Sequence, residues 1–105
     1  MKKILLACSS GMSTSLLVTK MQDYAKSIGD EAEIWAVGQD QAAEDMAKAD
    51  AVLIGPQMSF LKGQLEKEAA QYGIHVEVID MMAYGMVDGK KAYEQAVKLV
   101  ERKNG

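Results

Sequence analysis

One short segment carries the residue types that could do chemistry, and it reads Cys8-Ser9-Ser10-Gly11-Met12-Ser13-Thr14-Ser15. Its small side chains and its glycine allow consecutive backbone N–H groups to converge into a nest that binds an anion. A helical pattern follows directly, and the amino terminus of a helix adds partial positive charge, so phosphate is the expected ligand. Cys8 lies at the entrance of this nest, where the same field favours the nucleophilic thiolate.

Each feature of this segment also has a plainer interpretation. A single cysteine that ends a strand is usually a small buried apolar residue, but the loop around Cys8 favours a nucleophile. Serine and threonine hydroxyls also form turns and helix caps, and Ser13 is the best placed cap. Whether these hydroxyls cap the helix or bind phosphate stays open from the sequence. The residues that we predict for a phosphate-binding loop around Cys8 are Ser9, Ser10, Gly11, Met12, Ser13, Thr14 and Ser15.

The segment lacks the arginine that a cysteine phosphatase needs. Those enzymes use a Cys-x5-Arg motif, in which the guanidinium clamps the phosphoryl group through two hydrogen bonds. Thr14 stands at that position here, and the only arginine of the chain is Arg102. A site that binds phosphate and holds a nucleophile, but hydrolyses poorly, is typical of a carrier that accepts a phosphoryl group and passes it on.

Alternating strands and helices must position this segment. Short apolar runs predict strands over 3–7, 31–37, 51–54 and 75–79, and helical spacing predicts helices over 16–28, 39–48, 59–72 and 89–103, with a loop over 80–88. This alternation predicts an α/β fold, a small doubly wound four-stranded parallel sheet with helices on both faces. The first and third strands lack internal charges and belong in the centre, which gives the strand order 2-1-3-4. Ligands bind such sheets where the strand order reverses, and that point is the loop after the first strand.

The same geometry sorts the other candidates. Gln57 follows the third strand, beside the first, and is a candidate to donate a hydrogen bond to a phosphoryl group or to shape the rim; Tyr84 is a second rim candidate. Asp80 ends the fourth strand, about 10 Å sideways from Cys8, and we expect it to cap the following segment. His75 begins that strand at the opposite end of the sheet, about 16 Å away, and we expect an ordinary edge-strand histidine.

Composition sets the remaining limits. The 105 residues, of mass 11.4 kDa, suit one domain over 1–105. A net charge of −3 and a pI near 5.1 argue against a nucleic-acid partner. One cysteine allows no internal disulfide and no cysteine-based metal site. The apolar run before Cys8 is shorter than the roughly 7–15 residues of an export signal, and no stretch approaches the ~20 residues of a membrane span, so we expect a soluble cytoplasmic protein without direct membrane insertion.

The segment from Cys8 to Val18 closely resembles the active-site loop of one protein family, the lactose/cellobiose-type IIB components of the bacterial phosphoenolpyruvate-dependent sugar phosphotransferase system. The similarity extends over the whole chain, through Gly55-Pro56-Gln57, Val78-Ile79-Asp80 and Tyr84-Gly85. The resemblance implies a fold similar to that of the low-molecular-weight cysteine phosphatases. It also implies a phosphocysteine intermediate at Cys8.

The resemblance further implies the partners and the reaction. A phosphohistidine of the IIA component donates its phosphoryl group to Cys8, and the phosphocysteine passes it to a sugar bound by the membrane-embedded IIC component. Cellobiose, another β-glucoside, chitobiose and lactose are all compatible sugars. Both donors are already activated, so neither ATP nor Mg²⁺ is needed, and we expect no cofactor and no metal. Met12, Phe60 and Tyr84 are candidates for an exposed apolar collar on which the two partners dock in turn.

Two alternatives stay open. A low-molecular-weight cysteine phosphatase or arsenate reductase would share the sheet, but the missing arginine counts against the phosphatase and the missing partner cysteines against the reductase. A flavodoxin-like nucleotide-binding module would hold phosphate in the same loop without covalent chemistry. Only 6% of the residues are aromatic, which leaves little to enclose a flavin.

Overall fold

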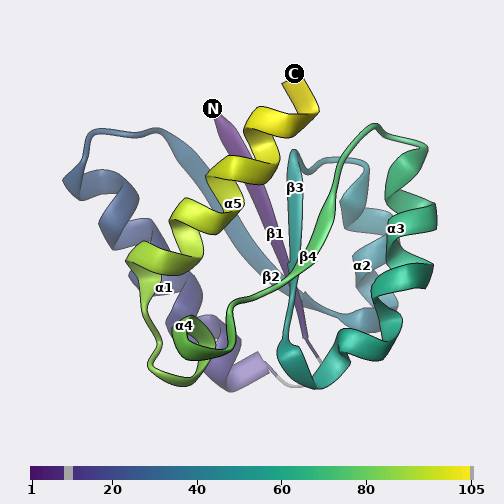
Figure 1. Ribbon diagram of the computed structural model, residues 1–105. Coiled ribbons are helices and arrows are strands. Elements are labelled where there is room, and N and C mark those ends of the chain that lie inside the picture. Colours follow the sequence, from purple (N-terminus) through teal and green to yellow (C-terminus); the bar gives the residue numbers. More distant parts are fainter. Residues whose placement is uncertain (9–10, 105) are drawn as a thin grey trace.

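The computed structural model describes residues 1–8 and 11–104, which form one sheet with helices packed against it (Figure 1). In chain order the elements are β1 (Lys2–Cys8), α1 (Gly11–Ser27), β2 (Ala32–Gly38), α2 (Gln39–Met46), β3 (Ala51–Ile54), η1 (Pro56–Leu61), α3 (Lys62–Ala70), β4 (Val76–Val78), α4 (Met81–Gly85) and α5 (Gly89–Asn104). None of the helices in this part of the chain is long and apolar enough to cross a bilayer.

The sheet has the predicted arrangement. Its strands are parallel and lie in the order β2-β1-β3-β4, so the prediction of a doubly wound four-stranded sheet is confirmed. In the register, Ala7 of β1 pairs with Val37 on one side and with Ile54 on the other. The carboxyl ends of β1, β3 and β4 therefore meet at one edge of the sheet, with Cys8 on the central strand.

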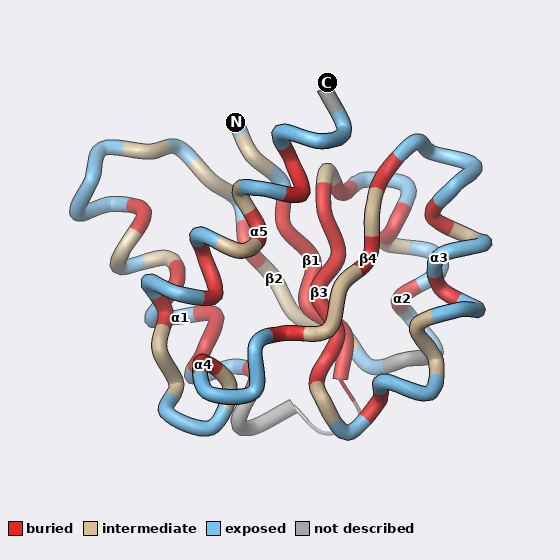
Figure 2. The backbone as a smooth tube through the Cα atoms, in the orientation of Figure 1, coloured by how far each residue is buried: buried red, intermediate tan, exposed pale blue. Residues whose placement is uncertain are grey.

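Helices cover both faces of the sheet. Helices α1 and α5 pack on one face, where Ile4 and Leu6 point, and α2 and α3 lie on the other, where Leu5 and Ala7 point. All four of these β1 side chains are at most 1% exposed, and Figure 2 shows the central strands buried along most of their length. A strand that is covered on both faces must be apolar at successive positions, which explains the uninterrupted apolar run before Cys8.

The segment after β4 differs from the sequence prediction. A loop was expected over 80–88, but the structure contains the short helix α4. The Asp80 carboxylate accepts a hydrogen bond of 3.1 Å from the backbone N–H of Ala83, so the predicted capping role of Asp80 is confirmed. This cap starts the helix, and the turn is too short to show a helical period in the sequence.

The predicted helix over 59–72 is also wrong in its first part. The chain forms the 3-10 helix η1 directly after β3, and α3 begins only at Lys62. Pro56 starts η1, since proline fits the first helical position, and Met58, buried with φ −112° and ψ 17°, interrupts the helical geometry. Apolar spacing alone does not separate a 3-10 turn from the α-helix that follows it.

Candidate active site

Cys8 and Thr14 form the centre of the site. Cys8 ends β1 with 2% of its surface exposed, and Thr14 of α1 is fully buried. The Thr14 hydroxyl donates a hydrogen bond of 2.6 Å to the Sγ atom of Cys8. This hydrogen bond joins the last residue of β1 to the first turn of α1. The position at which a phosphatase would hold an arginine is therefore occupied here by a neutral donor to the nucleophile.

Helix α1 supplies the second feature of the site. It begins at Gly11, three residues after Cys8, so its amino end adjoins the carboxyl edge of the sheet. The first backbone N–H groups of a helix have no partner within the helix, and they favour an anion. Ser9 and Ser10 of the predicted loop lie outside the described residues. Of Gly11, only the helical backbone is described, and the side chains of Met12 and Ser13 lie outside the description as well; Ser15 is exposed. Phosphate binding by this loop stays a prediction.

The chain after β3 brings the first rim candidate to the same edge. The backbone N–H of Gly55 donates to the carbonyl of Ala7 at 3.0 Å, which places Gly55 beside Cys8. The Gln57 carboxamide folds back over this glycine, because a Cβ atom at Gly55 would lie only 2.7 Å from its Oε1 atom. Only a glycine leaves room for this arrangement.

The second rim candidate contacts the first. Gln57 Nε2 donates a hydrogen bond of 3.1 Å to the hydroxyl oxygen of Tyr84, which lies on α4. The Tyr84 ring packs against the core on the α1 and α5 side of the sheet. Sequence patterns do not indicate this contact, because 27 residues separate its two members.

The other two candidates are held away from the nucleophile. The Asp80 carboxylate is used to cap α4. His75 precedes Val76, which pairs with Val52, and Val52 in turn pairs with Leu5. His75 is thus level with the residue four places before Cys8, about 13 Å along the strands, at the amino edge of the sheet.

Large apolar side chains are exposed on the elements of the carboxyl edge. Phe60 of η1 is 76% exposed, and Met81, Met82 and Met86 in and after α4 are 75%, 61% and 73% exposed. We call these four residues the apolar edge residues. Of the predicted collar, Phe60 is exposed as expected, Tyr84 is half-buried, and the Met12 side chain lies outside the described residues. Exposed apolar groups that gather at one edge are typical of a surface that binds other proteins.

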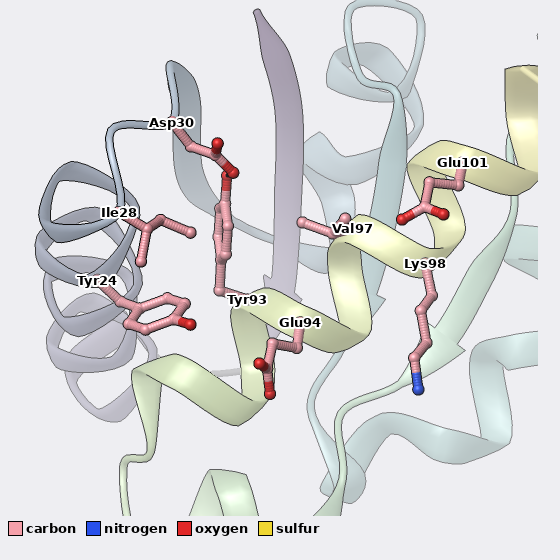
Figure 3. Close-up of a pocket in the computed structure, with 8 residues that line it drawn as sticks. All are labelled: Tyr24, Ile28, Asp30, Tyr93, Glu94, Val97, Lys98 and Glu101. Carbon is pink, nitrogen blue, oxygen red and sulfur yellow. The ribbon is translucent and has the colours of Figure 1, made fainter.

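A cavity of about 420 Å³ lies elsewhere, between α1 and α5 (Figure 3). Its walls include Tyr24, Ile28, Tyr93 and Val97, and none of the predicted site residues lines it. Asp30, which also lines it, precedes β2 and so lies at the amino edge of the sheet, away from Cys8. Within residues 1–8 and 11–104, no group of three or more His, Cys, Asp or Glu side chains could hold a metal ion.

Comparison with known proteins agrees with this geometry. The family model described as PTS system, lactose/cellobiose specific IIB subunit, matches residues 3–95. The oligo-beta-mannoside-specific EIIB component of the PTS system of Bacillus subtilis (strain 168) is 83% identical over 100 residues, which cover 95% of this chain and 97% of that protein. The galactose-specific EIIB component of Lactococcus lactis subsp. cremoris (strain MG1363) is 42% identical over 104 residues, covering 94% and 96%.

Solved structures show the same fold. The cellobiose-specific phosphotransferase IIB component from Borrelia burgdorferi has a TM-score of 0.80 at 37% identity, covering 97% of this chain and 94% of that one. The lactose-specific IIB component domain from Streptococcus pneumoniae has a TM-score of 0.83 at 16% identity, covering 93% and 96%, and so shares the fold. The chain therefore belongs to the lactose/cellobiose-specific IIB subunits of the phosphotransferase system, which are phosphotransferases that carry a phosphoryl group to a sugar and work with IIA and IIC partners.

Proposed function

We propose that Cys8 carries the phosphoryl group as a phosphocysteine, taking it from a phosphohistidine of IIA and giving it to a sugar held by IIC. The observation that carries this proposal is the hydrogen bond from Thr14 to the Cys8 sulfur, beside the amino end of α1. A thiolate held in this way is a prepared nucleophile next to a site that favours an anion.

The relay consists of two displacements at phosphorus. In the first, the Cys8 thiolate attacks phosphohistidine, an S–P bond forms, and the N–P bond breaks with its electron pair returning to the imidazole. In the second, a sugar hydroxyl attacks, an O–P bond forms, the S–P bond breaks, and the thiolate is restored while the hydroxyl proton passes to water or to a base of the partner. Backbone N–H groups at the start of α1 would stabilise the charge that spreads over the three equatorial oxygens.

The transported sugar is proposed to be an oligo-β-mannoside. The support is the relative of this specificity at 83% identity, against 42% for the galactose-specific one. Mannosides were not among the sugars that the sequence alone made us expect. The test adds membranes that contain IIC to the phosphorylated subunit and follows the loss of the labelled phosphoryl group. Mannobiose should remove the phosphoryl group faster than cellobiose does. Equal rates with the two sugars would contradict the proposal.

Both partners are proposed to dock at the carboxyl edge, on the cytoplasmic side of the membrane. The apolar edge residues support this, since they lie on the elements around Cys8. Methionine is flexible and packs against surfaces of different shape, which suits an edge that two partners use in turn.

The experiment that tests the relay is intact mass after incubation with phosphorylated IIA. Wild type should gain one phosphoryl group, and Cys8→Ser should gain none, because serine lacks a readily formed anion. His75→Gln is the matched control and should be phosphorylated like wild type. A phosphoryl group on Cys8→Ser, or its loss from His75→Gln, would contradict the proposal.

A further inference from the structure

The segments around the nucleophile contain no cation. Neither lysine nor arginine occurs in residues 8–18, 55–61 or 79–87, which follow β1, β3 and β4. The only charged residue there is Asp80, whose carboxylate caps α4. Any hydrogen bonds that these three segments give to a phosphoryl group in transit must therefore come from neutral donors.

The Gln57–Tyr84 pair provides such a donor. The Tyr84 hydroxyl oxygen accepts a hydrogen bond from Gln57 Nε2. The hydroxyl proton must therefore point away from Gln57. Within the described residues no acceptor takes the proton of the Tyr84 hydroxyl, which is left to donate elsewhere. The Gln57 carboxamide lies over Gly55, whose backbone N–H donates to the carbonyl of Ala7, the residue before Cys8.

We propose that the Tyr84 hydroxyl, positioned by Gln57, donates a hydrogen bond to the phosphoryl group as it passes to and from Cys8. This inference rests on the proposed relay at Cys8. Tyr84 is the group that touches the phosphoryl oxygens, and Gln57 is a positioning residue that acts through it. A neutral donor suits a carrier better than arginine does, because a clamp with two charge-assisted hydrogen bonds would also oppose release of the group.

The solvent exposure of Gln57 and Tyr84 indicates that their effect depends on a docked partner. Gln57 is exposed and Tyr84 is half-buried, so water competes for this hydrogen bond in the isolated subunit. When a partner covers the edge, water is excluded and the same bond becomes stronger. Loss of the Tyr84 hydroxyl is therefore expected to slow transfer and to leave the stability of the isolated subunit unchanged.

The test is single-turnover transfer from phosphorylated IIA to wild type, Tyr84→Phe, Gln57→Leu and the double variant, with Tyr72→Phe as the control. Tyr72 is a partly exposed tyrosine that follows α3 at the opposite edge of the sheet. We expect Tyr84→Phe to lower the limiting rate of phosphoryl transfer about ten- to a hundred-fold. The concentration of IIA that gives half of the limiting rate should not change. Gln57→Leu alone should also slow transfer. The double variant should be no slower than Tyr84→Phe, because Gln57 acts through Tyr84.

Two results would overturn the inference. Tyr84→Phe could transfer at the wild-type rate, or both variants could raise only the half-saturating concentration, which would make the pair a docking contact. Either result would leave the relay intact as long as Cys8 of the wild type becomes phosphorylated. Absence of phosphorylation in the wild type would instead overturn the proposed function itself.

Discussion

At the scale of single residues, the hydrogen bond between Thr14 and Cys8 determines what the site can do. Both side chains are buried, so little water competes for the bond, and its effect falls directly on the sulfur. A phosphatase would place a positive charge at this position to bind the phosphate. Here Thr14 of α1 donates to the Cys8 sulfur instead. This suits the carrier role proposed for Cys8, in which the sulfur must act first as nucleophile and then as leaving group.

Replacing Thr14 with valine tests this role. Valine has nearly the same shape but no donor, so the Cys8 thiolate loses the 2.6 Å hydrogen bond. We expect Thr14→Val to be phosphorylated by IIA about ten-fold more slowly, or worse, since a hydrogen bond to a charged group contributes roughly 1.5–3 kcal/mol. The measurement is the transfer rate, together with the rate of Cys8 alkylation by iodoacetamide at pH 7.

Thr14→Ser is the control for the loss of the hydroxyl, and it should stay close to wild type in both assays. Valine keeps the threonine methyl group, whereas serine keeps the hydroxyl. Wild-type rates in Thr14→Val, or a loss of activity in Thr14→Ser alone, would therefore contradict this role of the hydrogen bond.

At the scale of elements, α1 and α5 pack closely together over one face of the sheet, the face to which Ile4 and Leu6 point. Helix α5 begins at Gly89, where a Cβ atom would collide with the backbone carbonyl of Lys20 in α1. The Asp88 carboxylate accepts a hydrogen bond of 3.1 Å from the Lys91 N–H and caps the same turn. The two helices can therefore approach only because this position has no side chain.

We expect Gly89→Ala to destabilise the subunit by about 2 kcal/mol or more, because rigid backbone must move to admit the methyl group. Gly63→Ala in α3 is the matched control, since its Cβ atom would meet nothing within 4 Å. Alanine there should raise stability by up to about 0.5 kcal/mol through helix propensity. Urea unfolding of the three proteins measures both effects, and equal stability of Gly89→Ala and wild type would show that α1 and α5 can separate at no cost.

At the scale of the whole molecule, a network at the amino edge joins segments that are far apart in the sequence. The buried Tyr93 of α5 donates a hydrogen bond of 3.0 Å to Asp30, and Lys2 of β1 lies 3.5 Å from the same carboxylate. Figure 3 shows the Tyr93 hydroxyl pointing at Asp30. Burial, then the hydrogen bond to Asp30 and its charge, raise the pKa of Tyr93 from 10.0 to about 12.

This shift in pKa predicts a loss of stability in alkali. Because the pKa of Tyr93 is higher in the folded protein than in the unfolded chain, its contribution is complete below pH 10 and is lost as the pH rises from 10 towards 12. We expect the stability of wild type to fall over that range by of the order of 1–2 kcal/mol more than that of Tyr93→Phe. The measurement is the urea midpoint at pH 9, 10 and 11, with Tyr72→Phe as a control that should follow wild type. Parallel curves for wild type and Tyr93→Phe would contradict the assignment.

The arrangement of the sheet and the position of Cys8 could be predicted from the order of the residues. The runs over 3–7 and 51–54, which have no internal charges, marked the central strands. Alternation of strands and helices with right-handed connections then left one strand order. Cys8 had to follow a central strand at the point where the order reverses. The capping role of Asp80 could also be predicted, because a cap is a contact with a residue nearby in the sequence.

Which side chains contact one another depends on how the elements pack. The sequence left open whether the Thr14 hydroxyl caps a helix or binds phosphate, and its hydrogen bond to the Cys8 sulfur was not among the predicted contacts. This contact forms because α1 already begins at Gly11. The contact of Gln57 with Tyr84 depends on the bend of the chain at Gly55 and on the short helix that Asp80 starts. Periodicity reports which face of an element is apolar, but contacts across a gap depend on register and side-chain direction, and these are fixed only when the elements pack.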